Sequence, residues 1–189
     1  IYPGIEEVST QQVSEVWSVS EKVTRGKSGK SYWSKTSELI CITYWLNEED
    51  CRQLEQSTYE AYLSLLSVLK DHGIFYPFRF WNYVPDINKG KGDEEIYKRF
   101  CNGRLKAFEA LEIKPECFPA ASALGHMSKG AVFYVFASAS KPQHFKNNKQ
   151  VNAYDYPRQY GISSPSFARA TGLTLAASPY LFISGTASI

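Results

Sequence analysis

Two long segments of this chain repeat their apolar residues at helical spacing, and each lies between β-rich runs. The first segment presents one apolar face, made of Leu54, Ala61, Tyr62, Leu65, Leu66 and Leu69. This spacing is typical of an amphipathic helix that packs on a sheet. Asn47 stands directly before three acidic residues, which predicts the N-terminus, and Gly73 predicts the end. We therefore predict a helix over residues 48–71.

The remaining elements follow from the same patterns. A second helix is predicted over 93–111, with Asp93 as its N-cap, and strands are predicted over 75–84, ended by Pro85, and over 130–138. Upstream, residues 13–23 and 39–46 are predicted to pair as a hairpin around the polar cluster 25–30. The order β-β-α-β-α-β predicts an α+β fold in which both helices cover one face of a mixed sheet.

After residue 140 the pattern changes and then restarts. Residues 141–160 are polar without a clean period, which indicates a long ordered connection. Residues 166–175 and 180–189 are predicted as two strands that repeat the opening hairpin. We predict a complete first domain over 1–140, followed over 141–189 by a connection and the first hairpin of a second, truncated domain. The chain begins at Ile1 and stops inside a strand-like run, so we expect it to be a segment of a longer protein.

Composition excludes several classes of partner. A net charge of +2 from 21 basic and 19 acidic side chains favours neither a nucleic-acid nor a membrane partner. The longest apolar run, 131–137, is far shorter than the ~20 residues that span a bilayer, and no signal peptide is recognisable. Four cysteines without a C-x-x-C pair predict free, buried thiols in a cytoplasmic protein.

No motif predicts a metal or a cofactor. His72, His126 and His144 lack metal-ligand spacing. The run GKSGKS at 26–31 resembles a phosphate-binding loop, but Thr24 stands where that loop needs its first glycine. The residues that follow have a β pattern instead of a helical one, so we interpret the run as a solvated hairpin loop.

The densest collection of functional side chain types lies in the segment 154–170. It interleaves two arginines and three tyrosines with a glutamine in an irregular stretch held by two prolines. Arginine supplies a rigid fork for a carboxylate, and tyrosine supplies an aromatic wall and a hydroxyl donor. The segment therefore suits a small anionic ligand. An equally good interpretation is an inter-domain strap whose arginines form ion pairs.

The motifs RFWNYVPDIN (79–88), YDYPRQYG (154–161), SPSFARA (164–170) and SGTASI (184–189) together resemble the chorismatase family. The resemblance runs from about residue 75 to the end of the chain. It implies an enzyme built from two RidA/YjgF-like (chorismate-mutase-like) halves that acts on chorismate. The reaction it implies removes pyruvate to give a dihydroxycyclohexadiene carboxylate or a hydroxybenzoate, and the sequence leaves the product open.

The resemblance also suggests site residues, all of them for substrate binding. Arg158 and Arg169 are expected to hold the two carboxylates of chorismate, with Tyr156, Tyr160 and Gln159 orienting the ring and the enol ether. Asn82 and Tyr83 are expected to line the pocket from the first domain. Enol-ether cleavage needs a general acid, and the family implies a glutamate beyond the present C-terminus. No catalytic residue is therefore assigned, and we expect the segment alone to be inactive.

Two other function classes remain open. A RidA-like imine deaminase would also use an arginine to hold a carboxylate, but it would leave the long first domain unexplained. In a non-catalytic binding or assembly domain, the arginine–tyrosine segment would serve packing alone. The sequence predicts a small-molecule substrate and leaves the oligomeric state open, with a homo-oligomer as one option.

Overall fold

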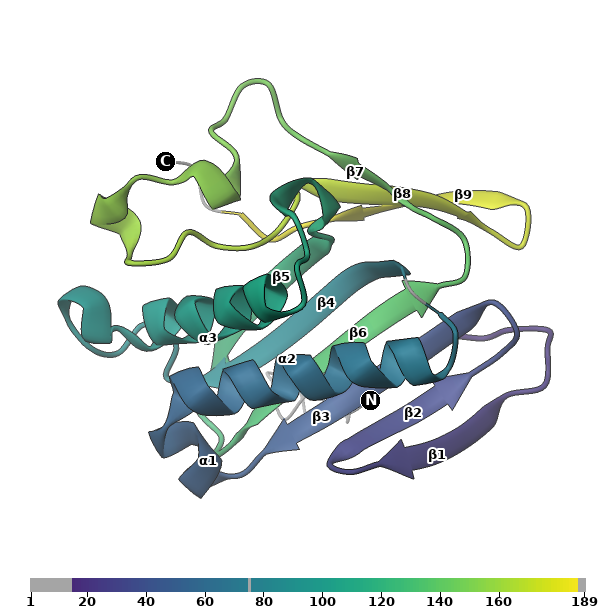
Figure 1. Cartoon of the computed structure of the whole chain (residues 1–189), viewed down its shortest axis with the longest axis horizontal. Coiled ribbons are helices and arrows are strands. Elements are labelled where there is room, and N and C mark those ends of the chain that lie inside the picture. Colours follow the sequence, from purple (N-terminus) through teal and green to yellow (C-terminus); the bar gives the residue numbers. More distant parts are fainter. Residues whose placement is uncertain (1–14, 75, 187–189) are drawn as a thin grey trace, which may run out of the picture.

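The computed structural model describes residues 15–74 and 76–186, and its centre is a six-stranded mixed sheet. The strand order is β1 (Thr24–Ser28), β2 (Ser31–Lys35), β3 (Leu39–Leu46), β6 (Ala131–Ser138), β4 (Tyr76–Pro85) and β5 (Ala120–His126). Neighbouring strands are antiparallel except β4 and β5, which are parallel. Helices α1 (Glu48–Arg52), α2 (Leu54–Asp71) and α3 (Ile96–Ala110) lie on one face (Figure 1). The predicted α+β class, with helices on one face of a mixed sheet, is confirmed.

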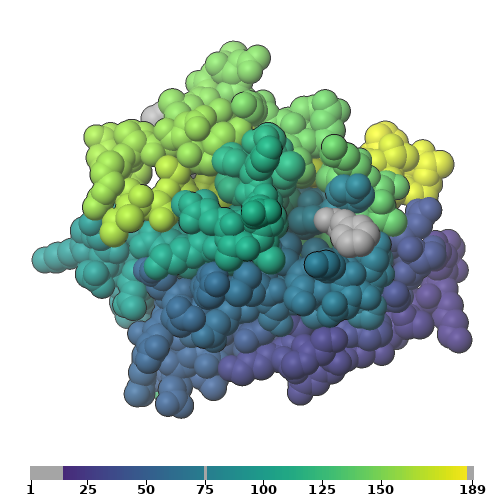
Figure 2. Space-filling view, in the orientation of Figure 1, coloured from purple at the N-terminus to yellow at the C-terminus, as the bar shows by residue number. Residues whose placement is uncertain are grey.

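A second, three-stranded sheet lies beside the β5 edge of the first (Figure 1). It is formed by β7 (Gln143–Phe145), β8 (Ala170–Leu175) and β9 (Ser178–Ile183). Between β7 and β8 the chain makes two short 3-10 helices, Ala153–Asp155 and Arg158–Tyr160. Two others, Gly92–Glu94 and Pro115–Cys117, flank α3. In the space-filling view, the later part of the chain covers one end of the molecule (Figure 2).

The first predicted helix is confirmed at both ends. Asn47 Oδ1 accepts the Asp50 N–H at 2.7 Å, and Asp50 Oδ2 accepts the Asn47 N–H at 3.1 Å, which completes a capping box. Gly73 follows the helix in the left-handed region, at φ +69°. The helix is interrupted at Gln53, where α1 ends and α2 begins.

Asp93 is not the N-cap of α3, and this prediction is wrong. Residues 92–94 form a separate 3-10 turn, and Glu95 is the N-cap, without a side-chain cap bond. The Asp93 carboxylate instead accepts two hydrogen bonds from the Arg158 guanidinium. An intramolecular arginine fork outcompetes the helix terminus for this carboxylate.

The predicted pairing of 13–23 with 39–46 is also wrong. Residues 13 and 14 lie outside the described part of the chain, and residues 15–23 form no strand. The hairpin is instead formed by β1 and β2, and β1 occupies most of the polar cluster that was predicted to be the loop. β3 pairs with β2 and with β6. β1 is an edge strand and largely exposed, so it needs no apolar pattern.

Besides β1, the structure contains two more strands that the sequence patterns did not predict, β5 and β7. β5 lies directly after Pro119, and its residues AASALGH are small and lack alternation. β7 lies within the polar connection over 141–160. The strands predicted over 166–175 and 180–189 are longer than the observed β8 and β9. Residues 187–189 of the second prediction lie outside the described part of the chain.

The core lies on both faces of the sheet. On the helix side, aromatic rings from α2, α3 and the sheet stack around Tyr62, which is fully buried. On the opposite face, Phe78, Tyr134 and Phe136 pack with Leu175 of β8. This second cluster attaches the smaller sheet to the larger one.

The two sheets are also joined by hydrogen bonds along β5. The Ala120 N–H donates to Thr171 Oγ1 at 2.8 Å, and the Ala121 N–H donates to Ser184 Oγ at 2.9 Å. Both hydroxyls are buried. The segment after β9 is therefore held against the outer side of β5 by side chains instead of by a continuous backbone ladder.

All four cysteines are free thiols, but they are not all buried as predicted. Cys101 is buried, Cys41 and Cys51 are half-buried, and Cys117 is exposed. Burial raises the pKa of the Cys41 thiol to about 12 and that of Cys51 to about 11, so both thiols are protonated at neutral pH. Cys117 is exposed because it ends the surface 3-10 turn before β5.

Within residues 15–74 and 76–186, the helices fall short of the length and apolarity that a membrane-spanning helix needs. Over the same residues, His, Cys, Asp and Glu side chains do not gather in threes or more to form a metal site.

Candidate functional site

Arg169 stands at the junction between the two sheets. Its N–H donates to the Phe145 carbonyl at 3.1 Å, and its carbonyl accepts the Ser184 N–H at 2.9 Å. The residue is thus fixed between the end of β7 and the end of β9, just before β8 begins. It is 7 % exposed, which is rare for arginine and requires polar partners.

The Arg169 guanidinium has only part of its hydrogen bonding satisfied. Nη2 donates to the Val151 carbonyl at 2.6 Å and to the Tyr156 hydroxyl at 2.8 Å. Nε and Nη1 are buried and have no partner. The guanidinium also lies over the rings of Tyr156 and Phe167, at 5.6 and 5.8 Å from their centroids. Two donor atoms of this fixed cation, Nε and Nη1, therefore remain available to acceptors.

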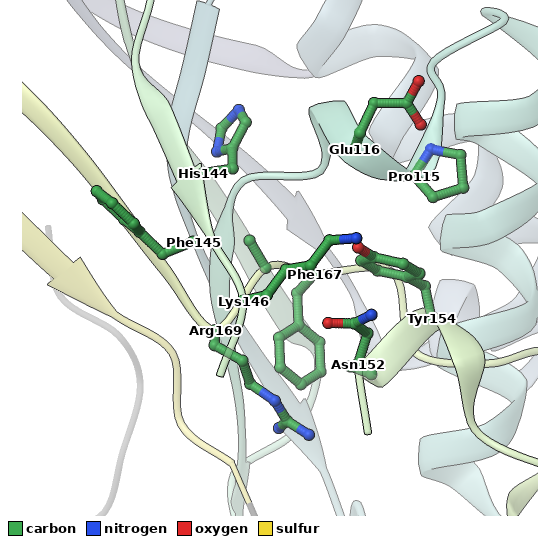
Figure 3. A pocket seen from close by; sticks show the side chains of 11 residues that line it. Pro115, Glu116, His144, Phe145, Lys146, Asn152, Tyr154, Phe167 and Arg169 are labelled. Carbon is green, nitrogen blue, oxygen red and sulfur yellow. The ribbon is translucent and has the colours of Figure 1, made fainter. Parts of the chain in front are cut away.

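A cavity of about 100 Å³ opens beside Arg169 (Figure 3). Its lining residues include Glu116, His144, Lys146 and Phe167. In Figure 3 the Lys146 amine lies by Tyr154, whose ring centroid is 5.8 Å away, and the Arg169 guanidinium lies beside Phe167. The cavity is smaller than the ~300 Å³ at which ligand pockets usually begin, so it suits a single carboxylate-sized group.

His144 contributes a neutral polar group to this cavity. Its Nδ1 lies 3.0 Å from Thr171 Oγ1, which already accepts the Ala120 N–H. The Thr171 proton is therefore free to donate to Nδ1, which places the imidazole proton on Nε2. Burial, and then the charge of Lys141, lower the pKa of His144 below its usual 6.5.

Arg158 lies in a different place from Arg169. Its Nη1 and Nη2 donate to the two oxygens of Asp93 at 3.0 and 2.8 Å, in a bidentate surface pair. This bond lowers the pKa of Asp93 and raises that of Arg158. Arg158 does not line the cavity beside Arg169.

Tyr156 and Tyr160 connect these two regions. Tyr156 bonds Arg169, and its ring centroid lies 5.7 Å from that of Tyr160, which is 39 % exposed. Gln159 is exposed on the same 3-10 turn. The structure thus brings Arg169, Tyr156 and Tyr160 into one contiguous group and leaves Gln159 at the surface.

Asn82 and Tyr83 lie on opposite faces of β4. Asn82 is fully buried on the helix side, where Oδ1 accepts the Tyr62 hydroxyl at 2.6 Å and Nδ2 donates to the Ser122 carbonyl at 3.0 Å. Tyr83 packs on the other face between Trp81 and Tyr134. The structure does not bring either of them to the cavity beside Arg169.

Sequence reasoning missed a second buried arginine. Arg104 of α3 is 2 % exposed, and its Nε and Nη2 atoms have no hydrogen-bond partner. It occupies the same helix face as Phe100 and Phe108, four residues away on either side. The position of a charged residue in the middle of the apolar face of the predicted helix could have identified Arg104 from the sequence.

Both the sequence and the fold of this chain are similar to those of chorismatases. The family model "Chorismatase FkbO/Hyg5-like, N-terminal" matches residues 15–137. A "3-hydroxybenzoate synthase" of Streptomyces hygroscopicus is 39 % identical over 140 residues, which cover 71 % of this chain and 41 % of that protein. A "Chorismatase" of Streptomyces rapamycinicus is 29 % identical over 183 residues, covering 95 % and 54 %.

A crystal structure of a chorismatase superposes with a TM-score of 0.81 at 30 % identity. The match covers 87 % of this chain and 50 % of that one. The chain spans about half the length of the curated relatives that it matches.

Proposed function

Because this chain belongs to the FkbO/Hyg5-like chorismatase family, we propose that the protein removes pyruvate from chorismate. The product is a dihydroxycyclohexadiene carboxylate or a hydroxybenzoate. Relatives named "Chorismatase" and "3-hydroxybenzoate synthase" both support an activity on chorismate. The relatives are about twice as long as this chain, and we propose that part of the active site lies in the portion of those proteins that this chain does not match.

The observation that carries the proposal within this chain is the state of Arg169. A buried cation with two unpartnered donors is costly unless an anion completes it. Chorismate is a dianion, and a carboxylate can accept a charge-assisted hydrogen bond from either of these free donors. The Tyr156 hydroxyl accepts a hydrogen bond from Nη2 and so helps to hold the guanidinium in position.

The other predicted contacts extend this group. The Tyr160 ring packs at a tilted angle against Tyr156 at the surface, where it can cover the bound ring, and Gln159 lies on the same turn. Arg158 is proposed to hold the second carboxylate, for which it must exchange its bond to Asp93. Asn82 and Tyr83 were expected to line the pocket, but neither lines the cavity beside Arg169. We propose that Asn82 instead stabilises the sheet through its buried hydrogen bonds.

The reaction needs a proton on the vinyl carbon of the enol ether, attack of water on the resulting cation, and release of pyruvate. The chain's proposed part is to bind and orient the substrate, and the general acid is proposed to lie outside it. Forming the dihydroxycyclohexadiene carboxylate consumes one water, whereas forming a hydroxybenzoate consumes no net water, because the ring loses the elements of water as it becomes aromatic. Neither route needs an oxidant or a reductant, so the proposal includes no metal and no cofactor.

The fold is proposed to be RidA-like, with a complete domain over 1–140 and a second one beginning in 141–189. The strand order β1-β2-β3-β6-β4-β5, with one parallel pair, supports a single first domain built on one sheet. The β8–β9 hairpin, which belongs to a separate sheet, supports the start of a second domain. The four free thiols fit a reducing compartment, and we propose a cytoplasmic location.

Pyruvate release tests the function directly. The full-length enzyme is incubated with chorismate, and pyruvate is followed with lactate dehydrogenase. Stoichiometric pyruvate is the expected result, with none released by residues 1–189 alone. Ammonia release from an imino acid without pyruvate would favour the deaminase alternative, and neither activity would favour a binding domain.

A further inference from the structure

A second, larger cavity lies on the other side of Phe167 from the one beside Arg169. Its volume is about 430 Å³, within the ~300–1,000 Å³ range of sites for small organic ligands. Phe167 lines both cavities. The larger one is enclosed by α3, by β5 and by the residues that follow β9.

Arg104 supplies the only charge among the described residues that line this cavity. It is 2 % exposed, and no carboxylate of the described residues forms an ion pair with it. Its guanidinium lies 4.9 Å from the Phe100 ring centroid and beside the Tyr62 hydroxyl. Nε and Nη2 have no acceptor. A charge buried to this degree needs an anion or a full set of acceptors.

Ser122 provides a further donor to the same cavity. Its Oγ accepts from Arg79 Nη2 at 2.7 Å and from the Gly185 N–H at 2.9 Å. With both lone pairs occupied, the hydroxyl keeps its own proton to donate, and Arg79 polarises it. Ser122 lines the cavity, as does Thr186.

The remaining walls are mainly apolar. Ile87, Ala123, Leu124 and Phe167 line them, and no acidic side chain does. One buried cation, neutral donors and apolar walls match a monoanion with an apolar body better than a dianion or an inorganic ion.

We propose that this cavity is a binding site for a small organic monocarboxylate, with Arg104 holding the carboxylate. The segment after β9 closes the wall, because the Gly185 N–H and the Ser184 hydroxyl attach it to β5. The site is independent of the chorismate-cleaving function, since it uses none of the residues that hold the substrate in that proposal.

Calorimetric titration of the 189-residue chain with benzoate tests the site. Saturable one-to-one binding is expected, with the neutral isostere benzamide at least about tenfold weaker, because it lacks the charge that Arg104 holds. Phosphate that binds as tightly as benzoate, or the absence of saturable benzoate binding, would overturn the assignment.

Two variants locate the binding. Arg104→Met removes the charge at similar length and is expected to weaken benzoate at least about tenfold. Arg99→Met, half-buried on the same helix, is the matched control and is expected to bind as the wild type does. Equal binding by Arg104→Met would overturn the proposal.

Ala123→Phe decides the matter if Arg104→Met does not fold. It fills the cavity from β5 without touching the charge. Loss of benzoate binding in a folded Ala123→Phe protein supports the site, and unchanged binding contradicts it. Pyruvate release from chorismate is measured separately, so failure of this site and failure of the proposed function give different results.

Discussion

The Tyr62 hydroxyl of α2 donates a 2.6 Å hydrogen bond to Asn82 Oδ1 of β4, inside the core between helix and sheet. Both side chains are fully buried, and burial raises the pKa of Tyr62 to about 12. Asn82 Nδ2 continues the network to the Ser122 carbonyl of β5. The bond therefore ties a helix to two parallel strands, one of which lines the Arg104 cavity.

Tyr62→Phe is expected to destabilise the fold by about 1–3 kcal/mol, because Asn82 Oδ1 is then buried without a donor. Urea unfolding measures the loss. Tyr32→Phe on the exposed side of β2 is the control and is expected to change stability little. A Tyr62→Phe protein as stable as the wild type would show that Oδ1 finds another donor.

Gly103→Ala is expected to destabilise the chain although alanine is the better helix former by ~1 kcal/mol. An added Cβ would collide with the Glu55 backbone carbonyl of α2 and lie 2.9 Å from Thr58 Cβ. Separating the two helices costs about 1–3 kcal/mol, which exceeds the propensity gain. A higher urea midpoint for the variant would contradict the close approach of α2 and α3.

The pKa of His144 predicts part of the pH dependence of stability. Burial, with a smaller effect from Lys141, lowers this pKa in the folded chain from 6.5, so the unfolded state binds the proton more readily. The stabilisation that neutral His144 gives to the folded chain is fully present above pH 6.5, and it is lost as the pH falls through the pKa of His144 in the folded state.

Replacing this histidine isolates its contribution from those of the other histidines. His144→Gln is expected to lose less stability than the wild type between about pH 8 and pH 5.5. His72 and His126, whose pKa values are also lowered, remain in both proteins and cancel in the comparison. Urea midpoints at the two pH values provide the measurement, and parallel pH profiles would count against a neutral His144.

Arg169→Lys is expected to lower kcat/KM for pyruvate release from chorismate about 10- to 150-fold in the full-length enzyme. A lysine amine cannot hold Tyr156 and also offer a fork to the substrate, which removes about 1.5–3 kcal/mol of charged hydrogen bonding. Arg99→Lys serves as the control. An unchanged rate in Arg169→Lys would assign this arginine a packing role.

Arg158→Lys carries the same expected loss in kcat/KM, about 10- to 150-fold, if Arg158 holds the second carboxylate. Asp93→Asn distinguishes this role from a structural one, because it weakens the surface pair and leaves the guanidinium intact. The rate of Asp93→Asn is expected to be at least that of the wild type. Equal losses in both variants would mean that the Arg158–Asp93 pair matters for structure alone.

The elements that could be predicted from the sequence are those that are buried either along one continuous face or along their whole length. α2 and α3 carry apolar stripes, and β6 is buried along its whole length, so each has a strong periodic or continuous signal. β1 and β5 have none. β1 is an exposed edge whose residues are Thr24, Arg25, Gly26, Lys27 and Ser28, and β5 consists of small residues after a proline.

For the candidate site, the residue types were predictable but their partners were not. The motif around Arg169 suggested a carboxylate-binding arginine but not its burial or its bond to Tyr156. The Arg158–Asp93 pair joins residues 65 positions apart and leaves no local pattern. Arg104 did leave one, as a charge between Phe100 and Phe108 on an apolar face. Tertiary packing determines which distant residues pair, and neither secondary-structure propensity nor hydrophobic periodicity contains that information.

The hydroxyls that join the sheets along β5 have a consequence for self-association. An unpaired sheet edge invites strands of other chains to add to it. At β5, Thr171 and Ser184 occupy the outward N–H groups of Ala120 and Ala121 with side-chain oxygens, which cannot propagate a ladder. The opposite edge, β1, is short and carries Arg25 and Lys27, charges that discourage the same addition. Strand addition is thereby disfavoured along β1 and at the first two residues of β5.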